Sequence, residues 1–324
     1  MNIQDVFKRY QADLQKVEGY MAAALSSDVS LIPQVSHHLI GSGGKRFRPL
    51  LLMASASICG YEGERRHPLA AVIEFIHTAT LLHDDVIDDA DMRRGKAAAN
   101  HLWGNAASVL VGDFLYSEAF QLMAKHGNLE IIKVLARATN LMAEGEVFQL
   151  VKRGDPEISE KEYLSIIERK TSHLISAACS VGALLAEAPE EKITALGRFG
   201  LNLGFAFQIV DDALDYTAKE EEFGKAIGKD LDEGKMTLPL IRTLSRCSGE
   251  ERHRISAVVT NPARDGNSLL AVLELIRRGD GVDYAMNMAR SYIEEGKREL
   301  AIFPDQTPLQ DLLTMADYVT GRRT

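Results

Sequence analysis

Two groups of aspartates, each set in an apolar helical pattern, restrict what this 324-residue chain can fold into. The first group is Asp84, Asp85 and Asp88, which follow the apolar stretch 73–82. On a helix, Asp84 and Asp88 lie one turn apart on the same face, with Asp85 beside them. Because like charges at this spacing repel one another, the group indicates either a divalent-cation site or a solvated acidic helix end.

The second group, Asp211, Asp212 and Asp215, repeats the spacing of the first. Gln208 stands three residues earlier, so the four polar side chains share one helix face, while the other faces are apolar. This pattern predicts a buried helix whose acidic stripe lines an internal cavity. Carboxylate oxygens suit Mg²⁺, which completes its shell with water and substrate phosphates. Two such helices facing each other predict a cluster of Mg²⁺ ions and a phosphate-bearing substrate.

Cationic stretches near the aspartates are candidates for binding these phosphates. Lys45 and Arg48 follow the glycine-rich residues 41–44 and precede a helix, which suits an oxyanion cradle or a flexible basic turn. Arg93 and Arg94 follow the first aspartates and fit either bidentate phosphate binding or a surface loop.

A histidine and a long loop extend this pattern. His77 stands seven residues before Asp84, which places its ring on the acidic face of the same helix. Residues 222–239 follow the second aspartates and are rich in glycine and lysine. They fit either a lid that closes over phosphates or an ordinary surface loop.

Bulk properties exclude several classes of protein. The net charge of −9 argues against a nucleic-acid binder. The odd, scattered cysteines Cys59, Cys179 and Cys247 indicate reduced thiols. The first residues do not resemble a signal peptide, and the longest apolar run, 174–186, is shorter than the ~20 residues of a membrane span. We therefore expect a cytoplasmic protein without a transmembrane segment.

Helical periodicity runs through most of the chain, and no sustained two-residue alternation interrupts it. A composition of 46% hydrophobic but only 6% aromatic residues suits helices packed on helices. We predict an all-α protein, a single large helical bundle spanning residues 1–324 around a central cavity. Its helices are expected at residues 3–26, 30–39, 49–58, 66–92, 105–125, 128–151, 159–187, 190–218, 238–247, 250–260, 266–279, 281–301 and 306–321.

The motifs together resemble those of the trans-isoprenyl (polyprenyl) diphosphate synthases, in the family's order and across nearly the whole chain. The stretch 75–85 is similar to that of the long-chain, octaprenyl branch. The matching motifs are Gly43-Gly44-Lys45-Arg46-Phe47-Arg48-Pro49, Asp84-Asp85-x-x-Asp88 with Arg93-Arg94-Gly95, Lys170-Thr171, Phe207-Gln208-x-x-Asp211-Asp212-x-x-Asp215, and Gly234-Lys235-x-Thr237-x-Pro239.

This resemblance implies an isoprenoid synthase fold and a prenyltransferase reaction. An allylic diphosphate, such as farnesyl diphosphate, ionises between the acidic helices with the help of three Mg²⁺ ions. Isopentenyl diphosphate then attacks the allylic cation and loses a proton. Repeated cycles give a long trans product of about C40, octaprenyl diphosphate, for the side chain of a respiratory quinone. The family also implies a homodimer.

The resemblance assigns roles residue by residue. The metal ligands are Asp84, Asp85, Asp88, Asp211 and Asp212, with Asp215 as a further ligand, directly or through water. The allylic diphosphate is held by Arg93, Lys170, Lys225 and Lys235. Isopentenyl diphosphate is held by Lys45, Arg48, His77 and Arg94. Oxygens near the allylic cation come from Thr171 and Gln208.

Product length follows, by the same resemblance, from the wall below the first aspartates. Ala79 and Thr80 stand five and four residues before Asp84, where a bulky aromatic side chain would stop growth early. Their small size predicts an open tunnel, with Phe120 or Met123 as its floor. A shorter-chain synthase, of about C15 to C35, is the alternative within the family.

Other classes of protein fit the motifs less well. A metal-dependent phosphohydrolase would need further histidine ligands near His83 and Asp84, and the second group supplies none. A class I terpene cyclase would carry a different second metal motif. A non-catalytic partner subunit would lack intact acidic motifs.

Overall fold

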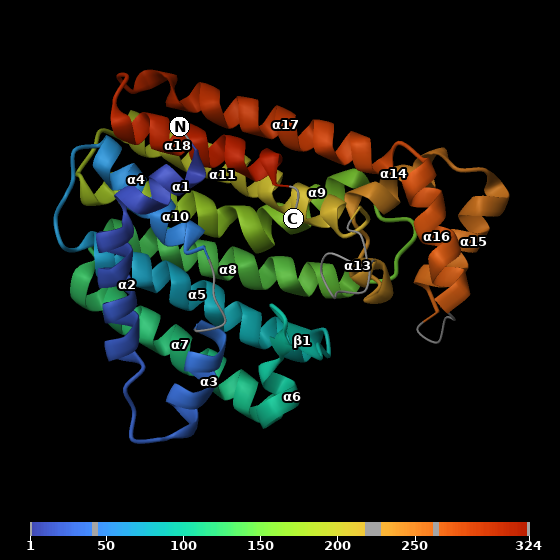
Figure 1. Cartoon of the computed structure of the whole chain (residues 1–324), viewed down its shortest axis with the longest axis horizontal. Coiled ribbons are helices and arrows are strands. Elements are labelled where there is room, and N and C mark those ends of the chain that lie inside the picture. Colours follow the sequence, from blue (N-terminus) through green and yellow to red (C-terminus); the bar gives the residue numbers. More distant parts are fainter. Residues whose placement is uncertain (1, 41–44, 218–227, 262–265, 323–324) are drawn as a thin grey trace. The chain divides into compact units, whose positions relative to one another are not determined.

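The computed structural model describes residues 2–40, 45–217, 228–261 and 266–322, and helices dominate it (Figure 1). The all-α prediction is confirmed. The strands that the described residues do contain, β1 (Met92–Arg93) and β2 (Lys96–Ala97), form one short antiparallel hairpin.

The helices match the predicted ranges to within a few residues at most boundaries. Helix 3–26 is divided at Tyr10, and helix 159–187 contains a π-helical turn. In chain order the elements are α1 (Ile3–Arg9), α2 (Gln11–Ala24), α3 (Leu31–Ile40), α4 (Phe47–Ile58), α5 (Arg66–Ile87), α6 (Ala99–Trp103), α7 (Asn105–His126), α8 (Leu129–Lys152), α9 (Glu160–Ile167), the π-helix η1 (Glu168–Ser172), α10 (His173–Leu185), α11 (Glu190–Leu214), α13 (Lys229–Asp232), α14 (Leu238–Arg246), α15 (Gly249–Val259), α16 (Gly266–Arg278), α17 (Gly281–Glu299), the 3-10 helix η2 (Leu300–Ile302) and α18 (Thr307–Gly321).

The chain divides into two compact units. The first comprises Met1–Thr139, Leu174–Gly197 and Leu300–Met315, and the second Asn140–His173, Arg198–Glu299 and Ala316–Thr324. The single domain expected from the sequence stays a prediction, and each unit is described by itself.

Helix α5 forms the centre of the first unit. Its apolar side chains Ile73, Phe75 and Ile76 are fully buried, and the helix packs against α2, α4 and α7 (Figure 1). Elsewhere in the same unit, α10 approaches α4 closely, since a Cβ at Gly182 would lie 2.5 Å from the carbonyl oxygen of Leu52. The small residues of α10 thus permit tight helix packing around the centre of this unit.

The second unit contains the acidic end of α11 together with α14, α16 and α17, which pack on one another. Among the described helices, α11 alone is as long and as apolar as a membrane span, and 56% of its most apolar window is buried in the protein. Core helices of soluble proteins share these properties. The expected lack of a transmembrane segment therefore stays a prediction.

Candidate active site

The first aspartates lie at the C-terminal end of α5. The N–H of Asp88 donates to the carbonyl of Asp84 at 2.8 Å, so these two residues stand one turn apart as predicted. Asp89 then adopts the left-handed conformation (φ 49°), and the N–H of Ala90 donates to the carbonyl of Asp85 at 2.9 Å. Together with the bond from the N–H of Asp89 to the carbonyl of Val86 at 3.4 Å, the Ala90 bond forms a Schellman motif that ends the helix. The helix predicted to reach residue 92 therefore stops at Ile87.

At this position a cation would stabilise the carboxylates. Carboxylates in the last helical turn face the negative end of the helix dipole, which destabilises them. Asp85 is fully buried, and Arg93 neutralises it by donating from Nε to Oδ1 at 2.8 Å. Asp84 and Asp88 are partly exposed.

The β1–β2 hairpin positions the arginine pair. Its register pairs Arg93 with Lys96, which leaves Arg94 and Gly95 as a two-residue turn. Both turn residues have positive φ, 51° and 77°, as a type I′ turn requires. The hairpin thus holds Arg93 against the end of α5 and presents Arg94 at its tip.

His77 lies among the predicted phosphate-binding cations of the first unit. Burial, and then the positive charges of Arg48, Arg94 and Arg93, lower the pKa of His77 well below its ordinary value. The ring is therefore neutral at neutral pH and offers one N–H donor. Lys45 lies exposed at the start of the same stretch as Arg48.

In the second unit, Asp212 is buried at the end of α11 and both its oxygens accept hydrogen bonds. The hydroxyl of Tyr163 donates to Oδ2 at 2.6 Å, and the amide of Gln208 donates to Oδ1 at 2.7 Å. The hydroxyl of Thr171 in turn donates to Gln208 Oε1 at 2.9 Å. Burial raises the pKa of Asp212 to about 7, although both direct hydrogen bonds oppose the rise. The sequence motifs containing Thr171, Gln208 and Asp212 thus meet in space.

The Lys170-Thr171 pair stands in the π-helical turn η1 between α9 and α10. Single π turns inside helices are frequent at functional sites. Gly145 of α8 allows this turn to approach closely, since a Cβ there would lie 2.7 Å from the backbone nitrogen of Lys170. The ammonium group of Lys170 pairs with Glu146 at 2.5 Å.

The other carboxylates of α11 face cations and backbone donors. Asp211 is exposed and lies 3.7 Å from Arg322, whose guanidinium stacks on the Phe207 ring at 4.1 Å. Asp215 accepts from the N–H of Asp230 at 3.0 Å. Lys235, the predicted phosphate ligand that follows, pairs with Glu233 at 2.6 Å.

The proposed chain-length residues differ in exposure. Ala79 and Met123 are buried, Thr80 is partly buried, and Phe120 on α7 is 50% exposed in the single chain. Lys225 lies outside the described residues.

The oxygen-rich donor sets at the ends of α5 and α11 fit a hard divalent cation. Among the residues that the structure describes, no three His, Cys, Asp or Glu side chains already converge as a metal site. The metal assignments therefore remain proposals.

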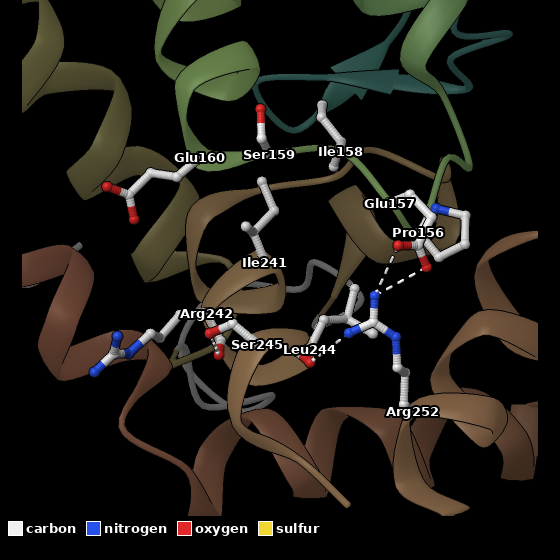
Figure 2. A pocket seen from close by; sticks show the side chains of 10 residues that line it. All are labelled: Pro156, Glu157, Ile158, Ser159, Glu160, Ile241, Arg242, Leu244, Ser245 and Arg252. Atoms are coloured by element: carbon white, nitrogen blue, oxygen red, sulfur yellow. Dashed lines mark hydrogen bonds and ion pairs between the residues drawn. The ribbon is translucent and has the colours of Figure 1, made fainter. Parts of the chain in front are cut away.

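A separate cavity of about 200 Å³ lies in the second unit (Figure 2). Its rim carries Arg252, which donates to both carboxylate oxygens of Glu157 at 2.9 Å. Ile158 and Leu244 lie within its apolar wall. None of its lining residues belongs to the motifs, so we assign it no part in the reaction.

Three residues near these motifs were missed from the sequence: Tyr163, Arg322 and Glu74. No pattern marks Tyr163 or Arg322, because both meet α11 through tertiary contacts. Glu74 carried a signal that could have been used: it is an acidic residue in an apolar run, three residues before His77.

Comparison with known proteins agrees with this geometry. The sequence profile of the polyprenyl synthetase family matches residues 29–276. The chain is 41% identical to the octaprenyl diphosphate synthase of Escherichia coli (strain K12) over all of its length and 99% of the relative's.

Two crystal structures share the fold over almost the full chain. A polyprenyl synthase from Caulobacter crescentus CB15, complexed with calcium and isoprenyl diphosphate, has a TM-score of 0.96 at 40% identity, covering 100% of this chain and 98% of that one. A decaprenyl diphosphate synthase from Rhodobacter capsulatus has a TM-score of 0.94 at 40% identity, covering 99% of each chain.

The helical fold and the two acidic helix ends define an enzyme of the all-α isoprenoid synthase class. Within that class, the chain belongs to the polyprenyl synthetase family. It is a prenyltransferase, as the motifs predicted.

Proposed function

We propose that this enzyme condenses isopentenyl diphosphate with an allylic diphosphate, farnesyl diphosphate among them, to make octaprenyl diphosphate. The proposal rests on one structural feature that occurs twice, a group of aspartates at the end of a helix. Both α5 and α11 end in a group of aspartates, and each group has a buried, hydrogen-bonded member beside more exposed ones. The identity to an octaprenyl diphosphate synthase supports the product class.

We propose that both acidic helix ends act on the same allylic diphosphate through Mg²⁺, with three ions per site. When bound, Mg²⁺ would neutralise the charge that develops on the leaving diphosphate. The more exposed Asp84, Asp88 and Asp211 are the better placed first ligands. The hydrogen-bonded Asp85 and Asp212 have fewer free lone pairs and add negative charge beneath them.

The cations of the chain would hold and stabilise the diphosphate groups. Arg93, Lys170 and Lys235 would bind the allylic diphosphate, together with Lys225. Each of the first three pairs with a carboxylate of the protein, which the diphosphate would replace or share.

Isopentenyl diphosphate would bind to the cations around His77. The neutral ring of His77 would donate a hydrogen bond to the diphosphate without adding a further charge to the arginine cluster. Lys45, Arg48 and Arg94 supply the positive charge.

The Thr171–Gln208 pair would stabilise the allylic cation with fixed oxygen dipoles. Thr171 donates to Gln208, and Gln208 donates to Asp212, so the lone pairs of both side-chain oxygens have a set direction. A dry site would protect the cation from water.

Growth to about C40 would follow from the small residues Ala79 and Thr80, with the buried Met123 of α7 as the proposed floor. The half-exposed Phe120 would act as a floor only if another surface covered it. A product of about C15 to C35 is the alternative, and its length separates the two proposals.

A homodimer would supply such a surface. One face of α7 exposes mainly apolar and small side chains, together with Asp113 and Gln121; the apolar and small ones are Val109, Leu110, Ser117, Phe120 and Ala124. Exposed apolar faces of this kind mark association surfaces.

We also propose a cytoplasmic enzyme whose product becomes the side chain of a respiratory quinone.

The proposal is tested by incubating the protein with farnesyl diphosphate and labelled isopentenyl diphosphate. Label should enter a longer prenyl chain only when Mg²⁺ is present, and chelation should abolish the transfer. Release of diphosphate without chain growth would instead indicate a cyclase or a hydrolase.

A further inference from the structure

Arg46 is held in a strained backbone conformation between two predicted ligands of isopentenyl diphosphate, Lys45 and Arg48. Its φ of 44° and ψ of 39° lie in the left-handed region, which disfavours residues with a Cβ. Its carbonyl accepts the first hydrogen bond of α4, from the N–H of Leu50 at 3.0 Å. Such strain persists only where the surroundings hold the residue, and it is common at functional sites.

The side chain of Arg46 supplies that restraint. The residue is only 9% exposed. Its Nη1 donates to Glu74 Oε1 of α5 at 2.8 Å, and its Nη2 donates to the carbonyl oxygen of Ile40 at 3.0 Å. One guanidinium thus connects the end of α3, the start of α4 and the middle of α5.

Glu74 is the more buried of two carboxylates beside Arg46, since the other, Glu18, lies 3.7 Å from Nε and is 56% exposed. Glu74 is 4% exposed and lies three residues before His77, so both side chains occupy nearly the same face of α5. Its charge acts on Arg94 as well as on Arg46. The positive charges of Arg46 and Arg48 in turn act on His77. Glu74 is therefore an internal counter-charge for the cationic cluster that we assign to isopentenyl diphosphate.

We propose that the Arg46–Glu74 pair is the positioning device of the isopentenyl diphosphate site. Nη1 and Nη2 of Arg46 donate to Glu74 and Ile40, and its Nε lies 3.7 Å from Glu18 Oε1, so the guanidinium acts through these neighbours and not on the substrate. By fixing the start of α4 against α5, the pair sets Lys45 and Arg48 at a defined place relative to His77. This inference rests on the proposed function and deepens it.

Two variants separate positioning from simple charge. Arg46→Lys keeps the positive charge but cannot reach both acceptors with a rigid fork. If Arg46 works by position, Arg46→Lys weakens isopentenyl diphosphate binding as much as Arg46→Met does. We expect at least about a tenfold loss in each, because small misplacements of binding groups are costly.

A double variant separates positioning from stability. Removing one partner of a buried pair leaves an uncompensated charge, whereas replacing both by apolar residues restores stability. Arg46→Met with Glu74→Leu should therefore recover thermal stability without recovering affinity for isopentenyl diphosphate.

The measurement is calorimetric titration with isopentenyl diphosphate alone, which has no allylic partner to react with. Steady-state kinetics should show a raised KM for isopentenyl diphosphate, with the KM for the allylic substrate within about twofold of the wild type. Asp311→Asn is the control, because it breaks the ion pair of the buried Asp311 with the half-exposed Arg9 in the same unit. It should lower stability and leave isopentenyl diphosphate affinity unchanged.

Three results would overturn the inference: near-normal affinity in Arg46→Lys, recovered affinity in the double variant, or an equal loss in Asp311→Asn. Failure of the wild-type protein to bind isopentenyl diphosphate would instead overturn the proposed function itself.

Discussion

At the scale of single residues, each of the two acidic groups has one buried aspartate and more exposed ones, a difference that the sequence spacing does not show. Asp85 is buried against Arg93, and Asp212 is buried against Tyr163 and Gln208. Their neighbours in each group remain more open. We propose that the buried members set the local charge and that the open members bind the cations.

Asp84→Ala should lower kcat/KM by roughly a thousandfold or more, because it removes a proposed Mg²⁺ ligand. It should not unfold the protein. Removing a carboxylate from the negative end of α5 stabilises the helix by about 0.3–1 kcal/mol. Kinetics and thermal unfolding without metal test both statements. Asp91→Ala, at a side chain 87% exposed beyond the helix, is the control and should change neither. Near-normal turnover of Asp84→Ala would exclude a role as ligand.

Tyr163→Phe should shift the pH dependence of the reaction. Burial raises the pKa of Asp212 to about 7, and the Tyr163 hydrogen bond lowers it. Without that bond the pKa rises further, so the acid limb of the rate profile moves to higher pH. The shift should reach up to roughly one pH unit, since a hydrogen bond contributes about 1 kcal/mol.

The raised pKa of Asp212 also predicts the direction in which the free energy of unfolding changes with pH. The folded-state pKa of Asp212 lies above its ordinary value of 3.8, so the folded protein binds the extra proton. The metal-free protein should therefore lose this contribution as pH rises from 3.8 through about 7. For the shift of the rate profile in Tyr163→Phe, the control is Tyr284→Phe, which removes a hydroxyl that donates to Glu160 at 2.9 Å. An equal shift in both variants would contradict the assignment.

At the scale of elements, periodicity predicted most helices but not how they end. The end of α5 depends on the left-handed Asp89, which no apolar pattern marks. The π turn at Lys170 and Thr171 was likewise invisible, because a single inserted residue leaves the periodicity almost intact. The resemblance predicted that Thr171, Gln208 and Asp212 belong to one site, but not the hydrogen bonds that join them. Tyr163, 49 residues from Asp212, has no sequence signal.

The end of α5 also carries a prediction about product length. Ala79 is fully buried five residues before Asp84. A tyrosine there would fill the path of the growing chain, so Ala79→Tyr should shorten the product to about C15–C20. Ala79→Ser, which adds little volume, is the control and should keep the long product. Unchanged long products from a folded, active Ala79→Tyr variant would contradict the tunnel proposal.

At the scale of the whole molecule, family, fold and reaction class followed from the sequence, since they depend on motifs spread along the chain. The oligomeric state could not be derived from these motifs, because it depends on a surface that forms only when the chain folds. Leu110 is 67% exposed on α7. Leu110→Glu should convert the proposed dimer to a monomer, because a charge placed in an apolar interface is costly.

Sedimentation measures this directly. Leu270→Glu is the matched control, at a leucine 62% exposed on α16, and it should leave the assembly state unchanged. A wild-type protein that sediments as a monomer would remove the dimer proposal and leave Phe120 exposed.

The most direct test of the whole account is the length of the product. Purified protein would be incubated with Mg²⁺, farnesyl diphosphate and labelled isopentenyl diphosphate, and the dephosphorylated chains would be sized. The account predicts a ladder that ends near about C40. An end point at about C15–C25 would keep the chemistry but contradict the open path beside Ala79 and Thr80. No chain growth at all would contradict the central claim.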